Sequence, residues 1–176
     1  MARDVLLVVD VLNDFQHEDG ELLLASFRER LPALRAALEK ARGEGTPVVY
    51  VNDRHGSWVD DAPGLVERAL EGRGGDVIRA VAPRPGEPVL LKGRYSGFDH
   101  TALDLLLDEL RVERLLLTGG ATEACVVQTG IDARERGYKV TILADACATL
   151  NEQIERVALR YADEVAGMMI ESERLG

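Results

Sequence analysis

The chain has 176 residues, a formal net charge of −10 and 46% hydrophobic residues. This length and hydrophobic content suit one compact domain spanning residues 1–176. A chain this acidic, without a basic stripe, is not expected to bind nucleic acid or an anionic membrane surface, because phosphate groups require positive charge on the protein.

The amino-terminal segment MARDVLLVVDVLNDF has only a short apolar run before acidic and polar residues follow. We therefore expect a buried strand there, and neither a signal peptide nor a membrane span. The chain has two cysteines, Cys125 and Cys147, too few for the disulfide framework of a small secreted protein. A cytoplasmic location is expected on this basis.

Short apolar runs alternate with amphipathic segments along the chain. The runs predict strands at residues 5–10, 47–52, 88–92, 114–119 and 138–145, and a weaker one at 166–170. The amphipathic segments predict helices at 26–42, 62–71, 101–110, 123–136 and 151–164. This rhythm predicts an α/β, doubly wound, mainly parallel six-stranded sheet with helices on both faces, a Rossmann-like arrangement. The Gly- and Pro-rich stretch from 72 to 88 is predicted to be a long connection.

Polar residues close several of the predicted strands. In open parallel sheets the ligand crevice lies beyond the carboxyl ends of the strands, so these residues are the first place to look for chemistry. The predicted strand ends carry three aspartates and a lysine, Asp10, Asp53, Asp145 and Lys92. The Gly119-Gly120 turn, at the end of another strand, leads to the thiol of Cys125. We expect them to converge on one rim.

The segment LLLTGGATEACVVQTGIDA is typical of a strand, a glycine turn and a helix, with Thr122 as a candidate N-cap and Cys125 in the first helical turn. Bringing a cysteine pKa from about 8.5 to near neutrality requires about 2 kcal/mol, whereas a helix terminus supplies only about 0.3 to 1 kcal/mol. A nearby lysine would stabilise the thiolate, but an equally close carboxylate would cancel most of that effect. We therefore expect Asp10 to accept the thiol proton as substrate binds while Lys92 holds the charge. The amides of Ala121 and Cys125 are candidate oxyanion donors.

Each of these residues also has a purely structural interpretation. A cysteine after a strand is often a small buried apolar residue, and a glycine turn before a helix needs no function. Asp10 could cap a turn, and Lys92 could be a solvated strand end. Asp10 and Lys92 nevertheless end two strands that are expected to be buried on both faces. An ion pair between them is favoured, because an unpaired charge in a buried position has a high desolvation free energy.

Three segments together resemble the motifs of isochorismatase-like cysteine hydrolases. They are VVDVLNDF, KGRYSGF and TGGATEACVVQTGIDA, in family order and at family-like spacing. The resemblance implies the isochorismatase-like hydrolase fold, a triad of Asp10, Lys92 and Cys125, and a non-proline cis peptide before Ala121. The sequence departs from the family pattern with Glu123 in place of aspartate and Gly130 in place of alanine.

Nicotinamidases of this superfamily bind a divalent metal through an aspartate and several histidines. Asp53 and His55 match part of that pattern, but no histidine lies between residues 56 and 99. We therefore expect no metal and no cofactor. The segment VNDRHGSW resembles instead a metal-free subgroup, which implies that Asn52, Asp53 and Trp58 shape the substrate pocket. Trp58 could equally be a core aromatic residue under a long loop.

The residues after Lys92 are predicted to form another wall of the pocket. Arg94, Tyr95 and Phe98 would present aromatic surface beside a guanidinium, although Arg94 could instead pair with a surface carboxylate. Phe15, near Asp10, is expected to give an apolar lining, and Thr122 to face the same pocket from the turn.

Three functions remain open from the sequence. The first is hydrolysis of a small-molecule amide or related C–N bond through a Cys125 thioester. The second is isochorismatase-type vinyl-ether hydrolysis, which the resemblance implies would rely on Asp10 rather than on the thiol. The third is a non-catalytic binding or assembly module on an inherited fold. The surplus apolar residues of the predicted helices 123–136 and 151–164 further predict a homo-oligomer, a dimer or a tetramer.

Overall fold

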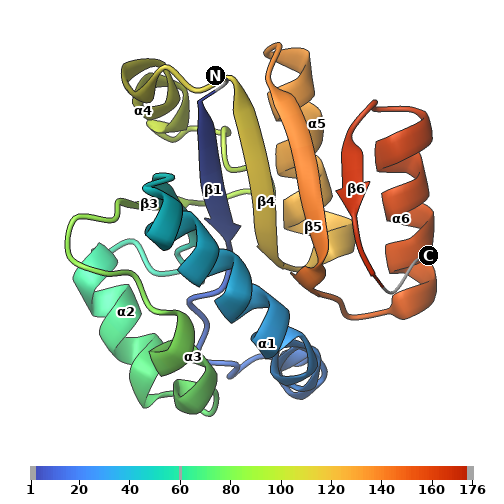
Figure 1. The fold of residues 1–176 in the computed structure, drawn as a ribbon. Coiled ribbons are helices and arrows are strands. Elements are labelled where there is room, and N and C mark those ends of the chain that lie inside the picture. Colours follow the sequence, from blue (N-terminus) through green and yellow to red (C-terminus); the bar gives the residue numbers. More distant parts are fainter. Residues whose placement is uncertain (1–2, 60, 174–176) are drawn as a thin grey trace.

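Six parallel strands form one sheet in the computed structural model, which describes residues 3–59 and 61–173. The strands lie in the order β3-β2-β1-β4-β5-β6 (Figure 1). Their bounds are β1 (Asp4–Val9), β2 (Val48–Asp53), β3 (Val89–Lys92), β4 (Arg114–Gly120), β5 (Lys139–Ala148) and β6 (Met169–Glu171). Strands β2 and β3 follow one another on one side of β1, and β4, β5 and β6 follow on the other side. The strand order therefore reverses between β1 and β4, which is the topological switch point. The predicted doubly wound α/β fold is confirmed.

Helices cover both faces of this sheet. Those in front in Figure 1 are α1 (Gly20–Glu44), α2 (Ala62–Glu71) and α3 (Gly75–Val81), and the opposite face carries α4 (Leu103–Leu110), α5 (Val127–Glu135) and α6 (Glu152–Glu164). Alternate residues of β1 enter the two cores: Leu6 and Val8 pack on the α1 side, and Leu7 and Val9 on the α5 side. An unbroken apolar run follows from burial on both faces. None of the helices in the described ranges has the length and apolarity needed to cross a bilayer.

Two helices differ from the prediction. α1 begins at Gly20 rather than at residue 26, because Leu23 and Leu24 bury in the core despite the polar residues that precede them. α3 lies inside the stretch predicted to be a connection. It buries Val77, Ile78 and Val81, so tertiary packing outweighs the surrounding glycine and proline signals.

The prediction that Asp145 closes the fifth strand is wrong. A register shift between Leu117 and Gly119 of β4 lets β5 continue to Ala148, where it pairs with Gly120. The Asp145 carboxylate accepts a hydrogen bond from Ser172 Oγ at 2.6 Å, beside β6. It therefore takes no part in the rim that the other strand ends form.

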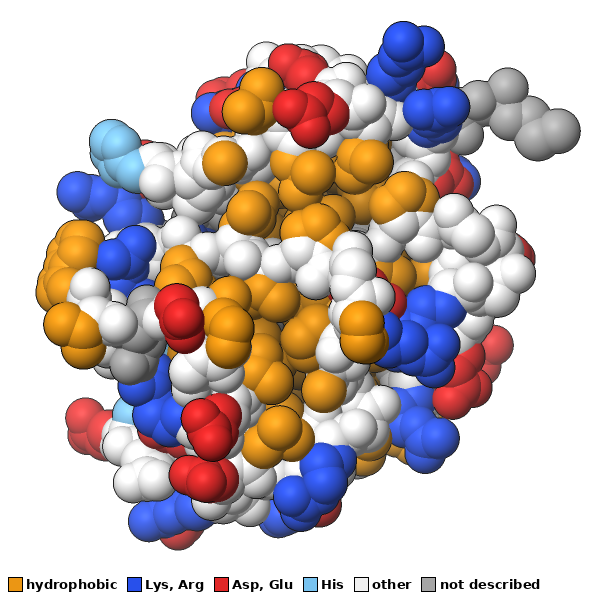
Figure 2. All heavy atoms as spheres, turned by 90° about the vertical axis from the view of Figure 1, so that its left-hand side faces the viewer, with side chains coloured by type: hydrophobic (Ala, Val, Ile, Leu, Met, Phe, Trp, Pro, Cys, Tyr) orange, Lys and Arg blue, Asp and Glu red, His pale blue; other side chains and the backbone are white. Residues whose placement is uncertain are grey.

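The β3 edge of the sheet carries an apolar face. Figure 2 shows hydrophobic side chains gathered in the hollowed centre of that side of the molecule, with charged residues around the margin. Three of the four residues of β3, namely Val89, Leu90 and Leu91, are apolar and only partly buried. Lys92, the last residue of the strand, is buried and turns towards the interior.

Candidate active site

The predicted acid, amine and thiol meet at the carboxyl ends of β1, β3 and β4. The Lys92 ammonium lies 2.7 Å from Asp10 Oδ2 and 3.5 Å from Cys125 Sγ. It also donates to the carbonyl oxygen of Arg94 at 2.8 Å. All three N–H groups of a buried ammonium therefore have an acceptor, which an amine that is only 1% exposed requires.

The backbone around Asp10 fixes the direction of its carboxylate. Asp10 has a φ of +50°, a left-handed conformation that is uncommon for a residue other than glycine. Its amide donates to the carbonyl oxygen of Val51 at 3.0 Å, and its Oδ1 accepts from the Asp53 amide at 2.6 Å. Strand β2 thus holds both ends of the residue and aims Oδ2 at Lys92.

The turn after β4 brings Cys125 to the same place. Gly119 has a φ of +123°, and a Cβ there would lie 1.9 Å from the carbonyl oxygen of Val9, so only glycine fits. The Gly120–Ala121 peptide is cis, as the resemblance implied. A π-helical turn, Thr122–Val126, carries Cys125 and continues into α5. Such turns are common at functional sites.

The prediction that Thr122 caps this helix is wrong. Ala121 occupies the N-cap position, and no side chain makes a capping hydrogen bond there. The Thr122 hydroxyl turns into the interior instead, where it lies 3.0 Å from both the Ala148 carbonyl oxygen and Glu155 Oε1.

The charges of the cluster show which group can act as a base. Burial raises the Asp10 pKa above its ordinary value, although Lys92 opposes this effect. Burial and the neighbouring Asp10 carboxylate raise the Cys125 pKa to about 12, which Lys92 only partly offsets. Burial acts to lower the Lys92 pKa, but Asp10 and Cys125 outweigh it and raise that pKa. Cys125 is therefore a neutral thiol at rest, in agreement with the argument from the sequence against a permanently ionised thiol.

Four of the residues predicted to line the pocket do not face open space, which corrects that prediction. Phe15 packs edge-on against Phe27 in the core, and Phe98 stacks on Tyr138. Asn52 is fully buried. Its side-chain oxygen accepts from the N–H of residue 12, and its side-chain nitrogen donates to the carbonyl oxygen of the same residue. The fourth is Thr122, described above. These four side chains therefore pack beneath the candidate site and do not contact substrate space.

Three other predicted pocket residues, Trp58, Tyr95 and Arg94, lie at the surface, whereas Asp53 is partly buried. Trp58 is 82% exposed, with the Arg54 guanidinium 4.4 Å above its ring, so the alternative of a core aromatic is wrong. Tyr95 is 68% exposed. The Arg94 Nε lies 3.6 Å from Asp99 Oδ2, the surface pairing that the sequence left open.

Known proteins resemble this chain over nearly its whole length. Residues 4–174 match the isochorismatase domain family. The uncharacterised isochorismatase family protein YaaI of Bacillus subtilis is 33% identical, over 98% of this chain and 95% of the relative. The chain belongs to the isochorismatase family. It is accordingly a hydrolase of that family.

Two further comparisons concern isochorismatase-family amidohydrolases. Ureidoacrylate amidohydrolase RutB of Stutzerimonas stutzeri is 28% identical, over 91% of this chain and 75% of the relative. The crystal structure of N-carbamoylsarcosine amidase from Thermoplasma acidophilum is 33% identical, with a TM-score of 0.75 over 98% of this chain and 99% of that one. Both proteins carry names of C–N bond hydrolases.

The Asp53–His55 pair of this isochorismatase-family chain does not fit a metal site. His55 Nε2 lies 3.1 Å from the carbonyl oxygen of Leu12, and Asp53 Oδ1 accepts from the His55 amide at 2.6 Å. Asp61, another carboxylate nearby in sequence, caps α2 by accepting from the Gly64 amide. Across residues 3–59 and 61–173, no three His, Cys, Asp or Glu side chains are grouped so that they could hold an ion.

Both departures from the family pattern have a structural explanation. The Glu123 carboxylate accepts from the Thr149 hydroxyl at 2.9 Å and from the Leu150 amide at 2.8 Å, so it ties the π-helical turn to the segment before α6. A Cβ at Gly130 would lie 2.7 Å from Met168 Sδ, so alanine there would require the Met168 side chain to move, whereas glycine accommodates it. These partners could not be predicted from the sequence, because they are distant along the chain and follow no periodic pattern.

A groove of about 620 Å³ lies elsewhere on this hydrolase. Its walls come from α1 and from β1, β4, β5 and β6, and include Ala37, Leu116 and Leu143. None of its lining residues belongs to the Asp10–Lys92–Cys125 cluster, so the groove is not the place to look for the chemistry of that cluster.

Proposed function

We propose that this chain hydrolyses a C–N bond of a small amide or ureide, with Cys125 as nucleophile and Asp10 and Lys92 as its catalytic partners. The observation that carries the proposal is the Lys92 ammonium, which contacts the Asp10 carboxylate at 2.7 Å and the Cys125 sulfur at 3.5 Å. A base, a positive charge and a nucleophile within contact distance are the parts that acyl transfer needs.

In the proposed first half-reaction, Asp10 takes the thiol proton as Cys125 Sγ attacks the substrate carbonyl carbon. A resting thiol with a pKa of about 12 requires a base in this step, and Asp10 is the carboxylate hydrogen-bonded to it. The oxyanion rests on the amides of Ala121 and Cys125. The protonated Asp10 then gives its proton to the departing nitrogen, the C–N bond breaks, and a thioester remains.

In the second half-reaction, water attacks the thioester carbonyl while Asp10 accepts one of its protons. The tetrahedral intermediate collapses, the C–S bond breaks, and Asp10 returns the proton to the sulfur. Lys92 stays protonated throughout and stabilises the negative charge as it moves between Asp10 and Cys125, consistent with its raised pKa. Neither a metal nor a cofactor takes part in the proposed cycle.

Ureides are the first substrate class to test. Ureidoacrylate and N-carbamoylsarcosine, the compounds in the names of two relatives, both carry a carbamoyl group on nitrogen. A carbamoyl carbonyl is a suitable electrophile for a thiol activated by a nearby base. The small-molecule substrate would enter from the side of Arg94 and Tyr95, which lie exposed beyond Lys92.

The test is a screen of the purified protein against ureides, simple amides, hydroxamates and isochorismate, with Cys125→Ala as the control. Turnover of a ureide or amide that the variant lacks supports the proposal. Turnover of isochorismate that survives in Cys125→Ala but is lost in Asp10→Asn would favour the vinyl-ether alternative instead. A protein that turns over nothing, and whose Cys125 resists small haloacetamides at every pH, would fit a non-catalytic binding module.

A further inference from the structure

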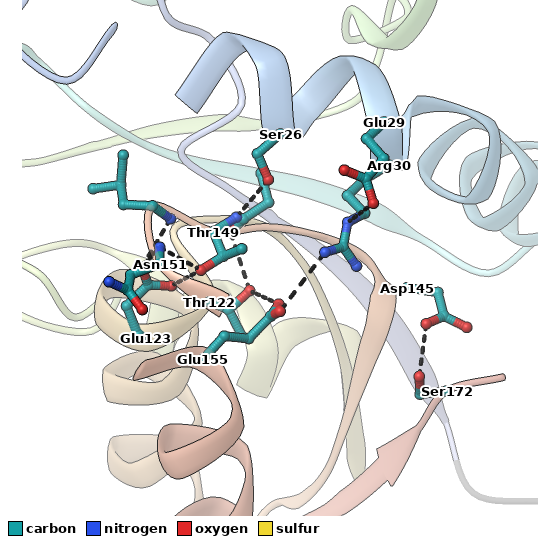
Figure 3. A network of polar contacts seen from close by, with 12 residues as sticks. Ser26, Glu29, Arg30, Thr122, Glu123, Asp145, Thr149, Asn151, Glu155 and Ser172 are labelled. Carbon is teal, nitrogen blue, oxygen red and sulfur yellow. Dashed lines mark hydrogen bonds and ion pairs between the residues drawn. The ribbon is translucent and has the colours of Figure 1, made fainter. Parts of the chain in front are cut away.

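A buried network of polar contacts lies behind the turn that carries Cys125. Thr122 follows Ala121 directly, and its hydroxyl has no exposed surface. The hydroxyl lies 3.0 Å from the Ala148 carbonyl oxygen of β5. It also lies 3.0 Å from the Glu155 carboxylate of α6 (Figure 3). One side chain of the turn is thus tied to a strand and to a helix.

The network continues to the other side of the sheet. Glu155 Oε2 lies 3.7 Å from Arg30 Nη2, and each of these two side chains is only 3% exposed. Arg30 belongs to α1 and Glu155 to α6, so the ion pair connects the helix layers that cover opposite faces (Figure 3). The Thr122 hydroxyl is the point at which this connection reaches the turn.

Stability alone is a weak explanation for these buried charges. Replacing a buried ion pair with apolar residues of similar volume is often neutral or stabilising. Here the pair is also imperfect: within the described residues, Arg30 Nε and Nη1 have no hydrogen-bond partner, and Nε has only an ion-pair contact at 3.5 Å with the exposed Glu29 carboxylate. A poorly satisfied polar network in a core is better explained if its geometry serves another purpose, namely to fix the position of the group that it contacts.

We propose that Glu155, held by Arg30, is a positioning residue that fixes the turn carrying Ala121 and Cys125 through the Thr122 hydroxyl. The inference rests on the proposed function. Oxyanion donors must be aimed at the reacting oxygen to within a fraction of an ångström, and the sulfur must stay in contact with Lys92. Without the hydroxyl contact, the π-helical turn would keep the Glu123 contacts to Thr149 and Leu150, but it would lose its link to the Glu155 carboxylate of α6 and, through it, to Arg30 of α1.

Thr122→Val removes the hydroxyl at nearly constant volume, and Thr118→Val is its matched control. Thr118 is also fully buried, and its hydroxyl also donates to a β5 carbonyl, that of Ala146, at 2.6 Å. We expect Thr122→Val to lower kcat by about tenfold or more while KM changes by less than about threefold. Thr118→Val should keep kcat within about threefold, and Thr122→Ser should restore it.

The double variant Arg30→Met/Glu155→Met separates positioning from stability. Because both charges leave together, we expect a melting temperature at or above that of the wild type. The kcat should nevertheless fall by about tenfold, as in Thr122→Val. A double variant or a Thr122→Val variant with kcat within threefold of the wild type would overturn the positioning role.

Alkylation of Cys125 with iodoacetamide gives a readout that needs no substrate. As the sulfur moves away from Lys92, the alkylation rate at a given pH should fall by about threefold or more in Thr122→Val and in the double variant, but not in Thr118→Val. If the wild type hydrolyses none of the compounds screened, the proposed function fails, and this comparison still decides the positioning role. Equal alkylation rates in all four proteins would refute it.

Discussion

The ammonium of Lys92 has three N–H donors, and the structure places one acceptor on each: the Asp10 carboxylate, the Arg94 carbonyl oxygen and the Cys125 sulfur. Lys92→Met keeps the stem and removes the charge. We expect kcat/KM to fall by about 10² or more, and the free energy of unfolding by about 3 kcal/mol, since the buried Asp10 carboxylate loses its counter-charge. Kinetics and urea denaturation measure the two effects. A variant within tenfold of wild-type activity would show that Lys92 is only structural.

Asp10 sets the acid limit of the proposed reaction. Its pKa is raised by burial, and below that pKa the carboxyl is protonated and cannot accept the thiol proton. We therefore expect kcat/KM to fall as the pH drops through a value above the ordinary aspartate range, and to show no rise near pH 8 to 9 of the kind that a free cysteine gives. A pH profile from 4 to 10 measures this. Activity that stays flat down to pH 4 would contradict Asp10 as the base.

At the scale of residues, the sequence predicted the cluster because every member closes a strand or follows a glycine turn. That rule found Asp10, Lys92 and Cys125, although it also selected Asp145, which lies outside the cluster. The residues behind the cluster could not be found in this way. Glu155 and Arg30 lie on helices, far from each other and from Thr122 in sequence. No periodic pattern indicates that charged side chains of these two helices are in contact.

Among the elements, the turn between β4 and the π-helical turn depends most on backbone geometry. We expect Gly119→Ala to destabilise the protein by about 3 kcal/mol or more, because a methyl group would overlap the Val9 carbonyl oxygen of the neighbouring strand at an unfavourable φ. Gly43→Ala is the control: it lies on α1 with nothing near its Cβ, and should stabilise by about 0.5 to 1 kcal/mol. Chemical denaturation compares them. Equal stability of the two variants would contradict the steric argument.

The sequence predicted element types better than their limits. α2 has the predicted bounds, since Asp61 caps its start and apolar residues recur at helical spacing. α3 was missed because it is short and lies among glycines and prolines, and only its burial against α1 and α2 reveals it. β5 runs past its predicted end because a register shift in the neighbouring strand, which leaves no local signal, extends the pairing.

For the whole molecule, we propose a homo-oligomer. α6 and its C-cap bear an exposed apolar stripe of Ile154, Val157, Tyr161 and Val165, on the side of the helix away from its buried face. Two-fold packing of such stripes is a common way to bury them, and an interface near 1,600 Å² would withstand the repulsion between acidic chains, which salt screens beyond about 8 Å.

Light scattering after size exclusion tests this proposal. We expect a dimer or tetramer for the wild type and a shift towards monomer for Val157→Glu, whose charge would lie in the stripe. Leu22→Glu, on an equally exposed apolar position of α1, should leave the assembly unchanged. A wild-type mass of one chain, 19.2 kDa, at micromolar concentration would contradict the proposal.

The central claim, that Cys125 is the nucleophile, is tested most directly by comparing turnover in the variants of the two cysteines. Cys147 is fully buried, has a raised pKa and lies outside the site, so Cys147→Ala is the matched control. On the best substrate from the screen, we expect kcat of Cys125→Ala to fall by a factor of about 10² or more while its melting temperature stays unchanged. Cys147→Ala should keep its activity even if its melting temperature falls. A Cys125→Ala variant that keeps a tenth of the wild-type rate would contradict the account.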